Sequence, residues 1–347
     1  MGAPNFRKLE RTELAVPPSS AGARLDRFLA DQFPDYSRSL LAGMIKDGLV
    51  AVQGLAPGKV KPALKLEAGW HITVEKPTLD APDLPPEDIP LAILFEDESL
   101  LVIDKPPDLP VHPPRAGRGG TLANALAHHC ANLPGGKLPG DDPVRPGIVH
   151  RLDADTSGVI VVAKDESALF KLSKQFETRT VEKVYLALCR GKPRSPGVID
   201  KPIGRHPDHY EMMRIDPAGK NAITEYEVLE QFKTIALVKL RPRTGRTHQL
   251  RVHLSAINHP IVGDRLYSRR PPLTRSEIAG REPEPGEAPL IARQALHAAS
   301  LSFDHPRTGE RLTFEAPLPE DFQRALSALR ESRPPRKPAE RPADSDE

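Results

Sequence analysis

Proline is the feature of this sequence that most limits where packed helices and central strands can lie. The chain of 347 residues contains 39 prolines, roughly twice the usual share of about 5%. Proline lacks a backbone N–H and has a fixed φ angle, so it interrupts helix interiors and central strands. Prolines gather in residues 77–90, 269–289 and the end of the chain from about 332. We expect these stretches to be a semi-rigid linker, a surface loop and a disordered tail, respectively.

The segments between these stretches divide the chain into a small module and a larger domain. After an N-terminal extension at residues 1–20, the module is expected at 21–76. The larger domain is expected at 91–320, followed at 321–347 by the end of a helix and the tail.

The module has the pattern of two helices followed by two strands. Apolar residues recur at helical spacing from Leu25 and again after Ser37, which is a residue type that caps helices. Strands are expected around residues 49–52 and 71–74. The basic positions of the module lie on its helices, at Arg24, Arg27, Arg38 and Lys46.

Alternating apolar and polar residues dominate the larger domain. One helix is expected at residues 167–176. Strands are expected at residues 93–95, 100–103, 159–163, 184–188, 224–228 and 236–240. Strands that follow one another with few helices between them favour a mixed, largely antiparallel sheet and hence an α+β fold.

A polar turn at residues 147–158 holds the densest group of chemically capable side chains. Turns rich in Asp, Thr, Ser and Gly form without any function, because their side chains bind the nearby backbone. On the other hand, Asp153 is flanked by His150 and Arg151 at the mouth of an apolar strand, which is a good setting for an ionised carboxylate. The residues alone leave both interpretations open and favour the structural one.

A second group of interest is basic. Residues 239–253 contain five Lys and Arg side chains and no acid. Thr247 can cap a helix that runs to about Ile257, before Pro260. A helix N-terminus with adjacent arginine is a natural phosphate site, although a solvated basic face has the same composition. The lack of a pairing acid nearby favours an anionic partner.

Several classes of protein are disfavoured by what the sequence lacks. It has no glycine-rich P-loop, no dinucleotide fingerprint and no metal-ligand spacing, so we expect neither a cofactor nor a metal. Its net charge is only +2, and its two cysteines, Cys130 and Cys189, give no disulfide framework. No apolar run is long enough to cross a bilayer, and the first residues lack the apolar core of a signal peptide. The protein is therefore expected to be cytoplasmic.

Residues 150–158, His-Arg-Leu-Asp-Ala-Asp-Thr-Ser-Gly, resemble the H-R-L-D-x-x-T-S-G signature of the RluA/RluD-type RNA pseudouridine synthases. The module resembles the S-four-type RNA-binding domain that such enzymes often carry. The whole arrangement is most similar to the RluD-like branch, whose members modify large-subunit ribosomal RNA. Further segments match the family in the same order, at residues 183–187, 202–206, 244–253, 259–264 and 293–298.

The resemblance implies an isomerase that breaks the N–C1′ bond of a uridine, turns the base over and rejoins it through C5. It implies that Asp153 is the catalytic carboxylate, acting either as nucleophile or as base. Arg246 matches the active-site arginine that would keep this carboxylate ionised, and Tyr185 matches the aromatic residue that stacks on the target base. Because Tyr185 alternates with aliphatic residues, we expect it on the strand face away from the core.

Other roles follow less directly. His150 and Arg151 are expected to contact phosphates or to support the site. The module residues Arg24, Arg38 and Lys46 are expected to bind RNA. The partner is expected to be ribosomal RNA, and the protein a monomer. Two alternatives stay open: a synthase that acts on transfer RNA or another RNA, and a non-catalytic RNA-binding ribosome-assembly factor.

Overall fold

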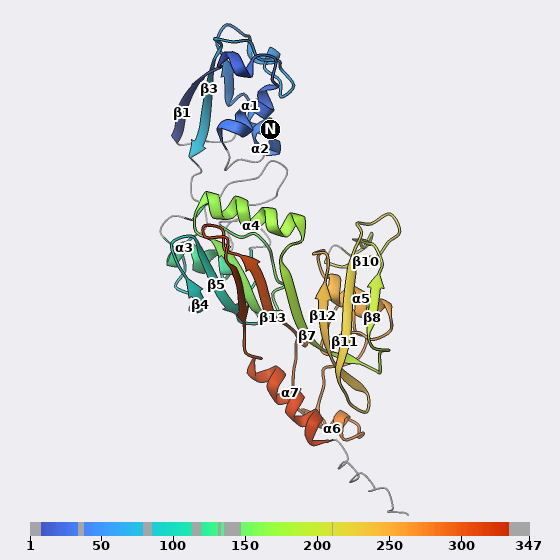
Figure 1. Ribbon diagram of the computed structural model, residues 1–347. Helices are drawn as coiled ribbons and strands as arrows, with labels where there is room; N and C mark the ends of the chain where they lie inside the picture. The colour runs from blue at the N-terminus through green and yellow to red at the C-terminus, as the bar shows by residue number, and fades with distance from the viewer. Residues whose placement is uncertain are drawn as a thin grey trace, which may run out of the picture. The chain divides into compact units, whose positions relative to one another are not determined.

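The computed structural model forms two compact units (Figure 1). Unit 1 comprises Met1–Glu182 and Ser300–Ala316, and unit 2 comprises Lys183–Ala299 and Pro317–Glu347. The long strand β13 (Leu296–Asp304) therefore begins in unit 2 and ends in unit 1. The residues that the structure describes are 8–33, 38–78, 85–112, 119–130, 133–134, 147–209 and 211–332.

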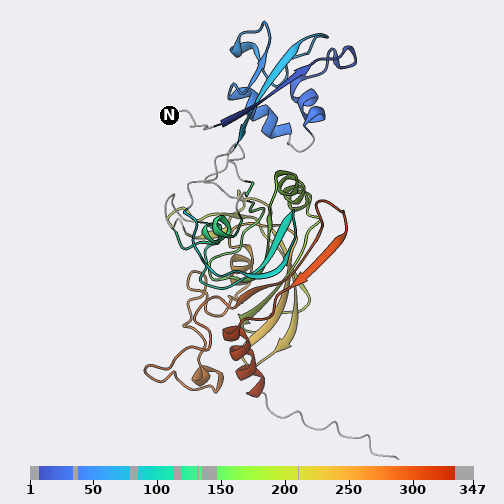
Figure 2. The same ribbon diagram turned by 90° about the vertical axis from the view of Figure 1, so that its left-hand side faces the viewer.

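The N-terminal part of unit 1 is a module built on a three-stranded antiparallel sheet (Figure 2). Strand β3 lies in the middle of the sheet and pairs with both β1 and β2. The predicted helices and strands are confirmed, whereas Ser37, the predicted cap, lies outside the described residues. The elements are β1 (Lys8–Ala15), α1 (Leu25–Gln32), α2 (Arg38–Lys46), β2 (Val50–Val52) and β3 (His71–Thr78), with 3-10 turns at Pro18–Ser20 and Pro57–Lys59.

Strand β1 corrects the prediction that residues 1–20 are an extension. All of Lys8–Ala15 pairs with β3, so the module begins at or before residue 8. The strand was missed because most of its residues are charged or polar, which hides the period-two pattern. Strand β1 is an edge strand of this sheet, and charged side chains are typical of edge strands because they prevent pairing with further strands.

A single apolar cluster holds the module together. Leu25, Phe28 and Leu29 lie at i, i+3 and i+4 of α1 and are almost fully buried. This spacing places them on one face of the helix. They pack in a cluster that also contains the buried apolar residues of α2, β2 and β3, namely Leu41, Met44, Ile45, Val50, Val52, Ile72 and Val74.

The remainder of unit 1 is a sheet with the order β4-β5-β6-β13, in which β14 pairs with β13. Strand β5 pairs antiparallel with β4 and β6, and β13 pairs antiparallel with β14. The predicted hairpin at residues 93–103 and the predicted helix at 167–176 are confirmed. Every residue of β6 is buried, as its apolar run predicts. The elements are β4 (Ala92–Glu96), β5 (Leu100–Lys105), α3 (Leu122–His129), β6 (Ser157–Ala163), α4 (Glu166–Thr178) and β14 (Arg311–Glu315).

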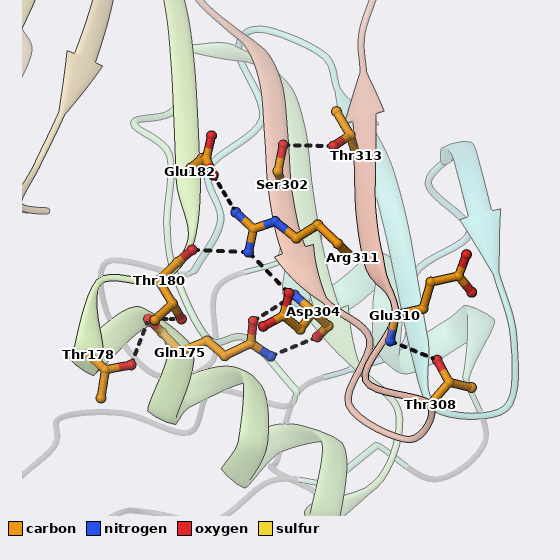
Figure 3. Close-up of polar contacts among 10 residues, drawn as sticks. All are labelled: Gln175, Thr178, Thr180, Glu182, Ser302, Asp304, Thr308, Glu310, Arg311 and Thr313. Atoms are coloured by element: carbon orange, nitrogen blue, oxygen red, sulfur yellow. Dashed lines mark hydrogen bonds and ion pairs between the residues drawn. The ribbon is translucent and has the colours of Figure 1, made fainter.

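Polar contacts fasten the C-terminal end of α4 to the β13–β14 hairpin (Figure 3). The side-chain amide of Gln175 donates to the Asp304 carbonyl and accepts from the Asp304 N–H, both at 2.7 Å. The Arg311 guanidinium bonds Glu182 at 2.8 Å and the carbonyl of Thr180 at 3.1 Å. Residues more than a hundred positions apart are thereby held together in unit 1.

Unit 2 has the strand order β13-β7-β12-β11-β8 and a separate two-stranded sheet of β9 and β10. Strands β7, β12, β11 and β8 pair antiparallel in turn, as do β9 and β10, which confirms the predicted α+β fold with a mixed, largely antiparallel sheet. The elements are β7 (Glu182–Arg190), β8 (Gly197–Asp200), β9 (Ile203–Arg205), β10 (Met213–Ile215), β11 (Ile223–Gln231), β12 (Ile235–Pro242), α5 (Gln249–Ala256), α6 (Arg275–Ile278) and α7 (Glu320–Glu331).

Two predicted boundaries in unit 2 are wrong. Residues 269–289 are not only a surface loop: they contain α6, and Leu273 is fully buried in the core. Arg190 ties this segment to β7 through an ion pair with Glu277. The domain also does not end at residue 320, because α7 buries its apolar side in the same core, through Phe322, Ala325, Leu326, Ala328 and Leu329. The predicted tail lies largely outside the described residues.

Candidate active site

The loop that carries Asp153 is fixed to the buried strand β6. Gly147 has a φ of 66°, and its carbonyl accepts a 2.8 Å hydrogen bond from Ala163 N–H at the end of β6. A Cβ at Gly147 would come within 2.1 Å of the Ala163 oxygen, so a larger residue cannot occupy this position without displacing the backbone. Ile148 forms an isolated bridge with Val162. The loop therefore begins at a defined place on the sheet.

His150 supports this loop from inside unit 1. Its Nε2 atom accepts a 3.1 Å hydrogen bond from Val161 N–H, and its ring stacks on Phe176 with 4.6 Å between centroids. An Nε2 that accepts cannot carry a proton, so this contact requires a neutral ring protonated on Nδ1. Leu152 is buried. The loop is thus anchored through His150 and Leu152, whereas Arg151 between them is exposed.

Asp153 is half-buried and begins a tight turn, in which Thr156 N–H donates to the Asp153 carbonyl at 3.0 Å. The next residue, Ala154, accepts a 2.8 Å hydrogen bond from the Lys105 ammonium. The backbone on either side of the Asp153 carboxylate is therefore held by hydrogen bonds that do not use the carboxylate itself.

Lys105 is a site residue that the sequence interpretation missed. It is fully buried, and its Nζ donates to the carbonyls of Pro106 at 2.6 Å, Leu109 at 2.9 Å and Ala154 at 2.8 Å. An ammonium has three N–H donors, and each of these three carbonyls lies at hydrogen-bond distance from it. The available signal was a lysine at the end of an apolar strand and directly before a proline.

Tyr185 lies in β7 of unit 2, where it is half-buried and packs against the main core cluster of that unit. The prediction that it lies on a face away from the core is wrong. From Ala187 onward both faces of β7 are covered, because Ala187, Leu188 and Cys189 are all fully buried. In this part of β7, residues on both faces of the strand pack against other residues, so neither face is a solvent side.

Arg246 lies between β12 and α5 of unit 2. Its Nε donates to the Asn221 carbonyl at 3.1 Å, and its backbone N–H donates to the Gln249 side chain at 3.0 Å. The predicted helix cap is wrong by one residue: α5 begins after His248, which has a left-handed backbone with a φ of 55° and makes no side-chain cap. Arg246 is thus held at both its backbone and its side chain.

The basic segment 239–253 is more fully paired than its sequence indicated. Arg243 forms a bidentate pair with Glu225 at 2.8 and 2.9 Å. Arg251 is buried and pairs with Asp264, at 2.7 and 2.9 Å. The expectation that no acid lies near these charges is therefore wrong, because the acids come from β11 and from a later loop.

The predicted site residues fall into three groups. The structure brings His150, Arg151 and Asp153 together on one loop of unit 1, and it places Tyr185 and Arg246 in unit 2. The predicted RNA contacts of the module form a third group. Arg24 precedes α1 and pairs with Asp26 at 2.9 Å, whereas Lys46 is the exposed last residue of α2. Arg38 begins α2, and its side chain lies outside what the structure describes.

One group of side chains in unit 1 has the composition of a metal site. The ligand atoms of Glu96, His129 and Cys130 lie within 4.8 Å of one another. However, the Lys164 ammonium bonds Glu96 at 2.7 Å and, with His129, lowers the pKa of that carboxyl. Burial also raises the pKa of the Cys130 thiol. A lysine cation already neutralises the carboxylate, and the thiolate that a metal would need is disfavoured.

Comparisons with known proteins add the decisive observation. The RNA pseudouridylate synthase family matches residues 99–256. Ribosomal large subunit pseudouridine synthase D of Pseudomonas aeruginosa is 43% identical over 324 residues, which cover 92% of this chain and 95% of that protein. The chain belongs to the RNA pseudouridylate synthase family. It is therefore an isomerase that acts on RNA.

Further matches agree with this membership. The synthase of the same name from Nitrosomonas europaea is 44% identical over 320 residues, or 92% of this chain and 88% of that protein. Among solved structures, human RNA pseudouridylate synthase domain containing 4 is 33% identical, covering 69% of this chain and 93% of that chain, with a TM-score of 0.53. The segment that matches the synthase family contains Asp153, Tyr185 and Arg246.

Among the described residues of this synthase, no helix is both long enough and apolar enough to span a membrane.

Proposed function

We propose that this enzyme converts specific uridines of large-subunit ribosomal RNA into pseudouridine, with Asp153 as its catalytic carboxylate. The observation that carries the proposal is the alignment with a relative named for that RNA over 92% of this chain and 95% of the relative. An alignment of this extent includes both the module and the parts that contain the site residues.

The reaction conserves all atoms of the uridine except for an exchange of protons with the solvent. The C1′–N1 bond breaks, a C1′–C5 bond forms, C5 loses its proton and N1 gains one. The Asp153 carboxylate assists the first step, either by attacking C1′ or by removing a sugar proton. The chemistry requires no external oxidant, reductant or group donor.

Each of the other site residues has a role in this proposal. Arg246 is the active-site arginine, whose planar guanidinium can bind an anionic group through two parallel bonds. Tyr185 stacks on the uracil ring. Because a stacked base cannot reach the carboxylate, the target uridine leaves its stack, at a cost of a few kcal/mol of unstacking free energy. His150 and Lys105 hold the loop of Asp153 and take no part in the bond changes.

The proposal extends to where and how the enzyme works. The module supplies RNA affinity through the exposed Lys46 and the other basic side chains of its surface. The enzyme acts as a monomer in the cytoplasm, and size-exclusion chromatography with light scattering tests its oligomeric state.

A map of pseudouridine across total RNA tests the proposed substrate. Cells that lack the gene should lose pseudouridine at one or a few large-subunit positions, and the wild-type gene should restore it. The Asp153→Asn gene is the matched control and should not restore it. Loss confined to transfer RNA would replace the ribosomal substrate with transfer RNA. An unchanged map would contradict the proposal as a whole.

A further inference from the structure

The side-chain amide of Gln249, at the start of α5, is hydrogen-bonded to its full capacity. Its Oε1 accepts from Thr244 Oγ1 at 2.7 Å and from the backbone N–H of Arg246 at 3.0 Å. Its Nε2 donates to the Ile223 carbonyl and to Thr224 Oγ1, both at 3.0 Å. A primary amide has two acceptor positions and two donors, and the side chain is buried. Gln249 therefore connects the loop of Arg246 to the first two residues of β11.

The direction of every hydrogen bond around this amide is determined. Thr244 Oγ1 accepts from Ile223 N–H at 3.0 Å, so its own proton is available to Gln249. Thr224 Oγ1 accepts from Gln249 and is hydrogen-bonded to Nδ1 of His253, at 2.9 Å. The Nε2 of His253 then carries a proton and donates to the Lys201 carbonyl at 3.0 Å.

Burial favours a neutral His253. The ring is fully buried, and burial lowers the pKa of His253. A neutral ring offers one donor and one acceptor, and both are used. The four side chains Thr244, Gln249, Thr224 and His253 thus form one connected chain of hydrogen bonds, which we call the Gln249 network.

The Gln249 network ends on the backbone of Arg246. The guanidinium of Arg246 is oriented separately, through the bond from its Nε to the Asn221 carbonyl. Two independent contacts, one on the backbone and one on the side chain, therefore determine where the Nη1 and Nη2 atoms of Arg246 lie. In a reaction that needs a well-placed charge, a shift of about 1 Å can cost about 100-fold in rate.

We propose that Gln249 is the positioning residue for Arg246, and that Thr244, Thr224 and His253 orient its amide for this task. The inference rests on the proposed function, in which Arg246 is the active-site arginine. Gln249 acts through Arg246 alone and does not touch the substrate.

Kinetics of substituted enzymes test the proposal. Gln249→Met keeps the volume of the side chain but removes all four hydrogen bonds. We expect kcat on saturating RNA to fall about 10- to 100-fold, with little change in RNA affinity. Gln175→Met is the matched control, because Gln175 also holds a backbone through both amide atoms, at Asp304 in unit 1. Its kcat should stay unchanged.

A double-mutant cycle separates positioning of Arg246 from a general structural role. If Gln249 acts through Arg246, Gln249→Met should cause no further loss of kcat in an Arg246→Ala enzyme. A loss that multiplies with that of Arg246→Ala would overturn the inference but leave the proposed function intact. Full activity of Arg246→Ala alone would instead overturn the role of Arg246, and the inference with it.

The Thr244 side chain provides a second test if Gln249→Met fails to fold. Thr244→Val removes one hydroxyl from the Gln249 network, whereas Thr244→Ser retains it. We expect a lower kcat for the valine enzyme only, and no effect of valine in an Arg246→Ala enzyme. Equal kcat for the valine and serine enzymes would count against the network.

Discussion

Asp153 lies on a loop whose backbone is fixed by bonds that do not involve its carboxylate. Its replacement by asparagine should therefore alter the chemistry and not the fold. Asp153→Asn should lower kcat by about 10⁴-fold or more, because an amide is neither a nucleophile nor a base at this position. Release of tritium from C5-labelled uridine measures turnover, and filter binding measures RNA affinity. Near-normal turnover would remove Asp153 from the mechanism; loss of binding together with folding would leave the turn a purely structural role.

Substitutions of Arg246 separate the effect of its positive charge from that of its planar guanidinium. Arg246→Lys should be strongly impaired and Arg246→Ala still more so. A lysine keeps the charge but lacks the planar fork that binds a carboxylate or phosphate through two parallel bonds. Comparison of kcat/KM for the three enzymes decides the matter. Equal values for lysine and arginine would mean that a diffuse positive field is sufficient.

Lys105 should matter first for stability. Lys105→Met leaves three carbonyls without their ammonium partner, and an unsatisfied buried group costs about 1–3 kcal/mol. We expect the free energy of unfolding to fall by about 2–4 kcal/mol, measured by urea denaturation. Lys164→Met is the control, since the Lys164 ammonium is partly exposed and should contribute less than about 1 kcal/mol. Similar losses in the two variants would argue against the special role of Lys105.

His253 should make the enzyme sensitive to acid. Its pKa is lowered by burial in the folded state, so the unfolded chain binds a proton at a higher pH than the folded chain does. The contribution of His253 to the free energy of unfolding is therefore fully present above its unfolded-state pKa of about 6.5. It is lost as the pH falls below that value. Urea denaturation at pH 7.5 and pH 5.5 should show this loss, and His253→Gln should reduce it. An equal loss in both proteins would assign the acid sensitivity to other groups.

At the scale of elements, the sequence predicted those helices and strands whose apolar residues recur at a regular local spacing. Strand β6 and helix α4 were placed correctly because their apolar patterns are uninterrupted. Strand β1 was missed because its charged and polar residues show no period-two pattern, and only its pairing with the distant strand β3 reveals it. The high proline content of residues 269–289 led to the prediction of a surface loop. The segment in fact contains the short helix α6, which is held by Arg190 of β7.

The same limit applies to the candidate site. The motif and the family resemblance predicted Asp153, Tyr185 and Arg246 as site residues from short stretches of sequence. The residues that hold them are not close in sequence: Lys105 and Ala154 are 49 positions apart, and Gln249 and Thr224 are 25 apart. Likewise, the acids that neutralise Arg243 and Arg251 come from other elements. Such contacts depend on tertiary pairing, which no local pattern encodes.

At the scale of the whole molecule, the module and the rest of the chain should divide RNA binding from chemistry. Deletion of residues 1–78 removes β1 and β3 together, so no strand loses its partner. The truncated enzyme should bind RNA more weakly and with a flatter salt dependence, because fewer phosphate contacts release fewer counterions. It should still form pseudouridine at saturating RNA.

Titrations of RNA binding at several salt concentrations check this division of labour. An unchanged affinity and salt slope would show that the module is not an RNA tether. A truncated protein that folds but stays inactive at any RNA concentration would show that the module is needed for the chemistry.

Unit 1 is closed by residues 300–316, which the chain supplies only after all of residues 183–299. Leu301 and Phe303 of this late segment are buried among residues of β5, β6 and α4. A ribosome adds roughly 5–20 residues per second, so the early part of unit 1 waits about 6–23 s for the strand that completes its core. During that interval the apolar side of β6 lacks these partners. We therefore expect the nascent chain to leave apolar surface of unit 1 uncovered until β13 and β14 have been synthesised.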